Sequence, residues 1–582
     1  MQPWHERHPE RLAEERQALL AFGATVHAVA DESDDGLIRW IVSIPVSSLG
    51  LPDGHPLPDP LRLNVVFPDS FPYMRPEVAT LDPFLLQRHH HPFGRNLCLL
   101  PRRTFYWDSD TLLANHLREQ LPLLVARAAG AENPAILEME GEQAEPYTDY
   151  YEYLQPAAVF VPTEIDVYEF PERGVLQVSA PRGIDGGIQV VVRGVETPTG
   201  AISPDLPESL GRQFPKKGRV PFVRLADPLD APNGQHGLAR LAEIGKPLKL
   251  ARVLSTKKGE LKLGAVLFPE ESVAGGTTGW LFIARWRSSG HRRKRAAPEK
   301  AHYVRAQRIG RTALLARKSG LSELGSKTIA LVGLGALGAP IALGLARAGA
   351  GLLRLLDRDV VDAGTVMRWP LGFPSVGHSK TDVLKHIIEA HYPYTSVTAV
   401  QRRLGSTFSD GEPEHLVLGQ FLEGADILVD AAAEWGVSHL LADLAREFRI
   451  PYARVFATAG AWGGEVSIIH PESDACWGCV YEAQKDGLMM FPSTAPSHEG
   501  EVQPTGCPDP TFTGAGFELD PISSEAVRMV VSSLLGPDGG SYPALPWQVA
   551  VLSLRDEEGR LIPPTWHTYP LKRHPRCPAH AD

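Results

Sequence analysis

The sequence predicts an α/β protein of several domains, and three observations lead to this fold class. The chain has 582 residues, which is too many for a single core. An amphipathic helix and hairpin strands open it, and a β-rich middle follows. After residue 327 strands and helices alternate, as they do in a doubly wound, mostly parallel sheet. We place the domains at residues 1–155, 156–298 and 299–582.

Composition excludes several classes of protein. Hydrophobic residues make up 43%, charged residues 22%, and the formal net charge is −11, so a general nucleic-acid binder is not expected. No signal peptide is visible at the start. The longest apolar stretch, 339–356, is interrupted by Arg347 and Arg354, so no membrane span is expected either. We expect a cytoplasmic protein, in which paired cysteines favour metal binding over disulfides.

The first domain reads as helix, meander, thiol loop and helix. Residues 8–21 have helical periodicity, 37–45 and 61–67 have strand patterns, and a second helix is expected over 110–128. Cys98 lies in the loop between the strands and this helix.

The middle domain offers strand patterns but no catalytic motif. The predicted strands are separated by loops rich in proline and glycine, and they cover residues 175–180, 187–192, 264–268 and 279–286. The basic run 285–295 is short and has one aromatic residue, so we interpret it as a domain boundary rather than a nucleic-acid patch.

The third domain begins with a predicted helical stretch over 303–321. A buried strand then leads into a turn containing Gly333, Gly335 and Gly338, with a helix from about residue 339. Bare glycine backbone lets a phosphate approach the positive end of that helix. Further strands are expected at 352–357 and 425–430.

The residues beyond this turn indicate whether the site binds a nucleotide such as ATP or a dinucleotide such as NAD. Asp357 ends the second strand, where it suits ribose hydroxyls. Asp359, Arg368 and Lys380 follow. Hydride transfer has no need of cations there, whereas an adenylating enzyme must hold ATP phosphates while a carboxylate attacks the α-phosphorus.

With these motifs, residues 303–577 resemble the adenylation domain of the ThiF, MoeB and ubiquitin-activating-enzyme family. The resemblance implies ATP-dependent adenylation of the C-terminal carboxylate of a ubiquitin-like protein, and a homodimer in which Arg305 reaches the partner's ATP site. The resemblance also implies that Asp430 belongs to the nucleotide site. Ala433 stands where the family has a Mg²⁺-binding Asp, which leaves Asp430 or Glu434 for the metal, and Trp369 also departs from the family pattern.

Four of the five cysteines gather near the end of the chain. Cys476 and Cys479 form a knuckle, and Cys577 with His580 supplies the further thiolate and imidazole that a structural Zn²⁺ site needs. Cys507 follows in a loop rich in glycine and proline. We interpret it as the thiol that takes the acyl group from the adenylate, the alternatives being a spare thiol or a zinc ligand in place of His580.

Residues 5–130 resemble a ubiquitin-conjugating enzyme core, which marks Cys98 as the acceptor of a thioester. The usual His-Pro-Asn appears as His91-Pro92-Phe93, so the asparagine amide is absent from its place, and Asn96 or backbone amides are the alternatives. The histidines 89–91 read as a solvated loop, with metal binding as the second interpretation.

The order of the domains is similar to that of fused activating and conjugating proteins of bacterial antiphage operons, best known from type II CBASS. That resemblance implies activation of the C-terminus of a cGAS-like nucleotidyltransferase (CD-NTase), relay from Cys507 to Cys98, and conjugation to target lysines. A bacterial ubiquitin-like protein is the alternative substrate. A MoeB-like sulfur-carrier adenylyltransferase and a nonenzymatic scaffold are the alternative functions.

Overall fold

The computed structural model of the chain forms two compact units. It describes residues 3–580 without 29–36, 52–54, 83–85, 87–88, 92–93, 100–106, 130–145, 166–170, 184–186, 198–199, 228–237, 239–240, 243–244, 257–258, 273–274, 289–300, 407–410, 503–510 and 537–539. The first unit holds residues up to 161, 165–203 and 216–307, and the second holds 162–164, 204–215 and the chain from 308 onward.

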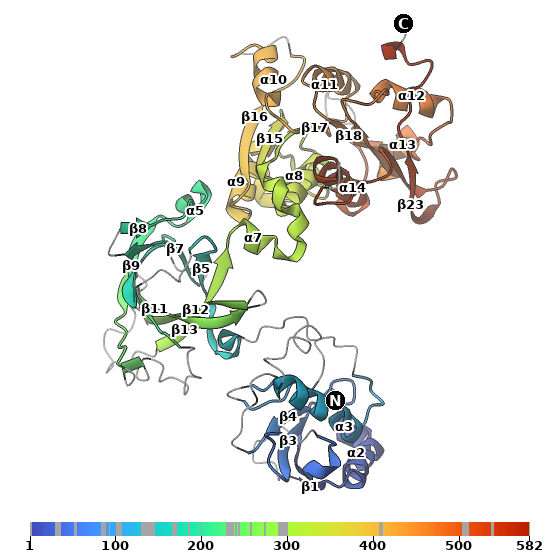
Figure 1. Cartoon of the computed structure of the whole chain (residues 1–582). Helices are drawn as coiled ribbons and strands as arrows, with labels where there is room; N and C mark the ends of the chain where they lie inside the picture. The colour runs from blue at the N-terminus through green and yellow to red at the C-terminus, as the bar shows by residue number, and fades with distance from the viewer. Residues whose placement is uncertain are drawn as a thin grey trace. The chain divides into compact units, whose positions relative to one another are not determined.

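The first unit begins with a small α+β part whose four strands form an antiparallel meander, as the sequence predicts (Figure 1). Its elements are α1 (Trp4–Arg7), α2 (Pro9–Ala21), β1 (Thr25–Ala28), β2 (Ile38–Ile44), β3 (Leu61–Phe67), β4 (Glu77–Thr80) and α3 (Leu113–Ala129). In β3, residues 61, 63, 65 and 67 are fully buried and those between them are not, because successive side chains point to opposite faces of a strand.

The remainder of the first unit is a nine-stranded sheet. Its strands are β5 (Tyr153–Pro162), β6 (Arg173–Ala180), β7 (Ile188–Thr197), β8 (Gly200–Ile202), β9 (Lys216–Arg224), β10 (Ala251–Thr256), β11 (Gly259–Ser272), β12 (Gly275–Ser288) and β13 (Ala301–Ile309). The order is β10-β11-β12-β13-β5-β7-β6-β9, and β9 also pairs with β11. Seven strands therefore close into a ring around a valine-rich core.

The position of β13 corrects the sequence-based account. Residues 303–321 were expected to be helical and to open the third domain. Instead Ala301–Ile309 form a strand whose residues 301–305 pair with β12, followed by the short α7 (Arg311–Leu314) and 3₁₀ turns over Ala316–Ser326. The strand is half-buried, and its apolar residues do not alternate regularly with polar ones. It belongs to the middle sheet, although the boundary at residue 299 had assigned it to the third domain.

The second unit is the doubly wound sheet that the sequence predicts. Five parallel strands, β16 (Ser396–Gln401), β15 (Leu352–Asp357), β14 (Thr328–Val332), β17 (Ile427–Asp430) and β18 (Tyr452–Ala457), lie side by side in that order. Antiparallel β19 (Gly463–Ile469), β22 (Val549–Arg555) and β23 (Leu561–Tyr569) extend one edge.

Helices cover both faces of this sheet (Figure 1). Residues of α8 (Gly338–Arg347), α9 (Lys380–His391) and α14 (Gly516–Leu535) share one core, and those of α10 (Glu414–Leu422), α11 (Trp435–Glu447) and α12 (Trp477–Lys485) share another. The order in which the strands are added reverses at β14, because the chain first continues to β15 and β16 on one side and then places β17 and β18 on the other. The gap between β14 and β17 is the switch point where such sheets bind ligands beyond the strands' carboxyl ends.

Three short elements precede α14. Helix α13 (Ser497–Gly500) leads into β20 (Glu501–Val502), which pairs with β21 (Thr511–Phe512) in a two-stranded antiparallel ribbon. Among the described helices, none is both long and apolar enough to cross a membrane.

A buried carboxylate ties the helices of the α+β part together. Glu15 of α2 is fully buried, and its Oε2 accepts a hydrogen bond of 2.8 Å from the backbone nitrogen of Leu113, the first residue of α3. Arg11 donates to its Oε1 at 3.1 Å and to the carbonyl oxygen of Thr111 at 2.6 Å. Burial raises the pKa of Glu15, and these donors partly offset that effect.

We predict that Glu15→Ala destabilises the α+β part by about 3 kcal/mol, because it leaves a buried amide and a guanidinium without their acceptor. Hydrogen exchange of the full-length protein should show roughly 100-fold faster exchange in α3. Glu14→Ala, an exposed carboxylate on the same helix, is the matched control and should leave these rates unchanged. Equal rates in the two variants would show that Glu15 does not stabilise α3.

Candidate functional site

The glycine turn lies at the switch point, and its three glycines have different constraints. Gly333 has a φ of +83°, and a Cβ there would lie 2.6 Å from the backbone of Ala431. A Cβ on Gly338 would lie 1.8 Å from the carbonyl oxygen of Gly333. Gly335 has nothing within 4 Å of its Cβ position. Two glycines are thus required by packing, and the third leaves the space over the turn open.

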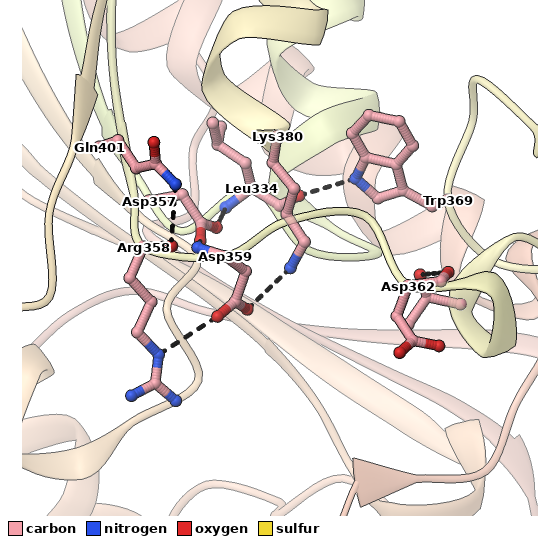
Figure 2. A network of polar contacts seen from close by, with 9 residues as sticks. Leu334, Asp357, Arg358, Asp359, Asp362, Trp369, Lys380 and Gln401 are labelled. Carbon is pink, nitrogen blue, oxygen red and sulfur yellow. Dashed lines mark hydrogen bonds and ion pairs between the residues drawn. The ribbon is translucent and has the colours of Figure 1, made fainter. Parts of the chain in front are cut away.

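Asp357, at the end of β15, holds the turn in place (Figure 2). Its Oδ2 accepts a 2.5 Å hydrogen bond from the backbone nitrogen of Leu334, and its Oδ1 accepts one of 2.7 Å from that of Asp359. The residue is only 9% exposed. A carboxylate oxygen has two acceptor positions, so each oxygen of Asp357 can still accept a hydroxyl.

Two predicted site residues meet directly next to this carboxylate. Lys380 is the first residue of α9, and its Nζ lies 2.9 Å from Oδ2 of Asp359. Arg358 lies 3.3 Å from the other oxygen of Asp359 (Figure 2). The side chain of Lys380 is only 10% exposed, whereas that of Asp359 is 47% exposed. This pair puts a partly buried cation beside the glycine turn, where an anionic group could be bound.

Arg368 and Trp369 lie on the loop that follows. The guanidinium of Arg368 donates to the carbonyl oxygen of Phe512 and lies 4.9 Å from the centre of that ring. Its burial lowers its pKa. Trp369 is 3% exposed and donates from Nε1 to the carbonyl oxygen of Leu334 at 2.9 Å (Figure 2). Sequence reasoning noted Trp369 only as a departure from a pattern and missed its contact with the turn.

Asp430 does not present a carboxylate to the site. It is 1% exposed and accepts hydrogen bonds from the backbone nitrogen of Ala432 at 3.0 Å, from Ser438 at 2.6 Å and from Tyr452 at 2.7 Å. Burial, together with Asp430, raises the pKa of Tyr452 and keeps it a donor. These partners make Asp430 a structural residue, which corrects its prediction as a nucleotide or metal ligand. Glu434 is exposed and precedes α11.

Arg305 lies on β13 of the other unit. It pairs in register with Leu281 of β12, its side chain is exposed, and its guanidinium lies 4.8 Å from the centre of the Tyr153 ring. Its location in a paired strand differs from the helical stretch in which the sequence placed it. A role in the partner's ATP site stays a prediction.

The four predicted metal ligands come together. One ligand atom from each of Cys476, Cys479, Cys577 and His580 lies within 4.8 Å of every other, and the sulfurs of Cys476 and Cys577 are 3.6 Å apart. The Nε2 of His580 is buried and has no hydrogen-bond partner among the residues that the structure describes. A Cβ on Gly478 would lie 3.0 Å from the Cys577 sulfur, so glycine lets the two chain segments approach.

This donor set fits a metal ion. Burial raises the pKa of the Cys577 thiol to about 12, so forming a thiolate there requires a nearby cation. Three sulfurs and one imidazole nitrogen match the ligands and the number of a closed tetrahedral site. With His580 as the fourth member, the cluster does not need Cys507, which lies outside the described residues.

The thiol of the α+β part is presented at the surface. Leu97 and Leu99 are buried while Cys98 between them is exposed, and the backbone nitrogen of Cys98 donates to the carbonyl oxygen of His89 at 2.8 Å. Asn96 forms a bridge with Ala79 of the β4 strand, and its two-residue spacing from Cys98 puts both side chains on the outer face. Pro92 and Phe93 lie outside the described residues.

The histidine run is not solvated, contrary to the expectation. His89 and His90 are buried, with His89 at a φ of +59°. The Nδ1 of His90 accepts from the backbone nitrogen of Leu86 at 3.1 Å, and its Nε2 lies 3.0 Å from Oγ1 of Thr80. Burial lowers its pKa, which keeps it neutral. Because both ring nitrogens of His90 are engaged in hydrogen bonds, neither is left to bind a metal. This argues against metal binding by the three histidines.

The glycine geometry generates a stability prediction. We expect Gly333→Ala and Gly338→Ala each to destabilise the second unit by at least about 2 kcal/mol, because a methyl group would collide with backbone. Gly335→Ala, in open space, is the matched control and should stay within about 0.5 kcal/mol. Thermal unfolding of the full-length variants checks this. A Gly335→Ala variant as unstable as the other two would contradict the conclusion that packing requires glycine at 333 and 338 but not at 335.

Comparison with known proteins assigns both ends of the chain. Residues 309–518 match the ThiF family, and residues 47–160 match prokaryotic E2 family B. The chain is 30% identical over 172 residues to the sulfur carrier protein ThiS adenylyltransferase of Bacillus subtilis, covering 28% of this chain and 47% of that protein. It is 25% identical over 254 residues to the ATP-dependent ubiquitin transferase-like protein Cap2 of Enterobacter hormaechei, covering 44% and 40%.

A third relative matches along nearly its whole length. The chain is 32% identical over 602 residues to the uncharacterized protein y4qC of Sinorhizobium fredii, covering 97% of this chain and 96% of that protein. The chain therefore belongs to the family of y4qC and is a fused E1/E2-like enzyme, in which a prokaryotic E2 family B domain and an ATP-dependent adenylyltransferase domain of the ThiF family share one polypeptide.

Proposed function

We propose that this chain activates the C-terminus of a protein, passes it through two of its own thiols and conjugates it to lysines of target proteins. The single observation that carries this proposal is the presence, in one chain, of a ThiF family domain and an E2 domain with an exposed cysteine. An adenylating domain alone would serve several reactions. An exposed thiol in an E2 domain adds an acceptor for a thioester.

The first step is adenylation. ATP binds over the glycine turn, with its ribose at Asp357 and its phosphates near Lys380 and Arg368. A carboxylate oxygen of the substrate attacks the α-phosphorus, the bond to the β-phosphate breaks, and pyrophosphate leaves. Mg²⁺ held with the phosphates would neutralise their charge. Glu434 is the candidate ligand for this ion, because its side chain is exposed. A homodimer would bring Arg305 of the second copy to this site.

The later steps transfer the acyl group between sulfurs. The Cys507 thiolate attacks the acyl carbon of the adenylate, a carbon–sulfur bond forms, and AMP leaves with the bonding electron pair. The Cys98 thiolate then takes the acyl group and releases Cys507. A lysine amine attacks this second thioester, loses a proton, and forms an isopeptide bond. Asn96, on the same outer face as Cys98, is the candidate to stabilise the oxyanion.

The substrate we favour is a CD-NTase, with the reaction serving antiphage defence in the bacterial cytoplasm. The similarity to Cap2 supports a ubiquitin-transferase-like reaction. A bacterial ubiquitin-like protein would use the same relay. The similarity to the ThiS adenylyltransferase supports a second candidate function, adenylation of a sulfur carrier. That function leaves the E2 domain and Cys98 without a role.

We predict that the full-length protein, incubated with ATP, Mg²⁺ and a candidate CD-NTase or ubiquitin-like protein, forms a thiol-sensitive adduct. Cys98→Ala should abolish conjugation to lysines but keep the adduct on Cys507, and Cys507→Ala should abolish both. Nonreducing gels distinguish these species. Cys98→Ser provides a control, because it should trap a stable ester at that position. Unchanged conjugation by Cys98→Ala would refute the relay.

ATP–pyrophosphate exchange tests the adenylation step separately. Lys380→Ala should lower the exchange rate by at least about 100-fold, because a partly buried cation beside the phosphates is lost. Lys385→Ala, on the same helix, is the control. Exchange without an adduct on either thiol would favour the sulfur-carrier function, and no exchange by the wild type would favour a binding scaffold.

We also propose that the cluster of three cysteines and His580 binds a structural Zn²⁺. The purified protein should contain about one zinc per chain, and Cys577→Ser should lose it. Because the ion replaces the thiol protons, chelation should lower the melting temperature of the second unit by several degrees at neutral pH. Elemental analysis and thermal unfolding measure these quantities. Full zinc content in both Cys577→Ser and Cys479→Ser would overturn the assignment.

A further inference from the structure

Two adjacent residues connect the glycine turn with a distant segment of the same unit. Trp369 is fully packed, and its indole N–H donates to the carbonyl oxygen of Leu334, the residue that follows Gly333. The backbone nitrogen of Leu334 donates in turn to Asp357. Both polar ends of Leu334 are therefore held, one by the carboxylate at the end of β15 and the other by Trp369.

Arg368 makes the contact on the other side. Its guanidinium donates to the carbonyl oxygen of Phe512 in β21 and lies 4.9 Å from the centre of the Phe512 ring. The neighbouring Met367 accepts at its carbonyl oxygen from the backbone nitrogen of Gly516, at 3.3 Å. Residues 367 and 368 thus hold the chain on both sides of the turn that leads from β21 into α14.

The loop that carries both residues is itself constrained. The side chain of Asp362 accepts from the backbone nitrogen of Gly364 at 2.7 Å. The backbone nitrogens of Arg368 and Trp369 donate to the carbonyl oxygen of Thr365 at 3.0 and 2.9 Å. A short helical turn therefore fixes the directions in which the two side chains leave the backbone.

The ribbon that Arg368 contacts has a defined place in the sequence. Glu501 pairs with Phe512 and Val502 with Thr511, so β20 and β21 flank residues 503–510, which include Cys507. The backbone nitrogen of Thr513 donates to the carbonyl oxygen of Gly500 at 2.7 Å and extends this pairing. Contact with Phe512 is thus contact with the base of the segment that carries the thiol.

We propose that Arg368 and Trp369 are positioning residues that couple the nucleotide turn to the β20–β21 ribbon. The inference rests on the proposed function, in which the adenylate formed over the turn must be attacked by Cys507. The attack forms a carbon–sulfur bond and releases AMP, so the thiol must come to the acyl carbon within bonding reach. In this coupling Trp369 contacts the glycine turn through Leu334, and Arg368 contacts the ribbon through Phe512.

The test uses the full-length protein with ATP and Mg²⁺ as the only ligands. N-ethylmaleimide alkylation of Cys507, followed by mass spectrometry, reports the ribbon, and Cys98 in the same sample is the internal control. In the wild type we expect ATP to change the Cys507 rate at least about threefold. Trp369→Phe, which keeps the packed ring and removes the N–H, should reduce this response to less than about 1.5-fold when each protein is measured at an ATP concentration that saturates it.

Hydrogen exchange gives a second measurement that needs no nucleotide. Arg368→Met should raise exchange of the amides in β20 and β21 by about tenfold, because one charge-assisted hydrogen bond to the ribbon is lost. Exchange in α9 should stay constant. Met367→Ala, next to it in sequence with a side chain 71% exposed, is the matched control.

The possible outcomes distinguish a failure of the proposed coupling between turn and ribbon, called the link below, from a failure of the proposed function. Unchanged ribbon exchange in Arg368→Met, or an undiminished ATP response in Trp369→Phe, would overturn the link. So would a wild type that binds ATP without any change at Cys507. A wild type that binds no ATP would refute the proposed function instead, and the exchange measurement would still decide whether Arg368 holds the ribbon.

Discussion

The carboxylate of Asp357 is the constraint on which the candidate nucleotide site depends. It accepts backbone hydrogen bonds from Leu334 in the glycine turn and from Asp359 in the next loop, so it joins the carboxyl ends of two neighbouring parallel strands. Asp359 in turn holds Lys380 at the start of α9. Without that carboxylate, the turn would lose an acceptor and the buried amide of Leu334 would be unpaired, at a cost of about 1–3 kcal/mol.

Sequence patterns predicted the parts of the fold that are built from local periodicity. β3 alternates fully between buried and partly exposed residues, and the glycine turn between β14 and α8 was placed correctly. The strand β13 was mistaken for a helix, since its apolar residues do not alternate with polar ones and only its pairing with β12 makes it a strand. The closure of the middle sheet through β9 and β11 was not predicted either, because no local sequence signal indicates which strands become neighbours.

The site residues divide in a similar way. The clustering of Cys476, Cys479, Cys577 and His580 was predictable, because sulfur and imidazole at knuckle spacing have few other uses. Asp430 was not, because its role depends on a tyrosine and a serine that the fold brings to it from β18 and α11. His90 is likewise defined by Thr80 and Leu86, whose positions only the folded loop reveals. A residue type suggests which chemistry is possible, and the neighbours decide whether the group is available for it.

The metal cluster and Arg368 constrain the same stretch of chain from two directions. Cys476 and Cys577 are 101 residues apart, so an ion bound between them would close a loop that contains Cys507, the β20–β21 ribbon and α14. Closing a loop of this length removes a large part of its conformational freedom, worth about 4–5 kcal/mol in a chain-entropy model for a covalent link. This closure limits the loop as a whole but leaves its interior free to choose among arrangements. The contact of Arg368 with Phe512 then selects one arrangement at the base of the ribbon. A bound ion would thus restrain this stretch of chain as a whole, while Arg368 restrains the base of the ribbon locally.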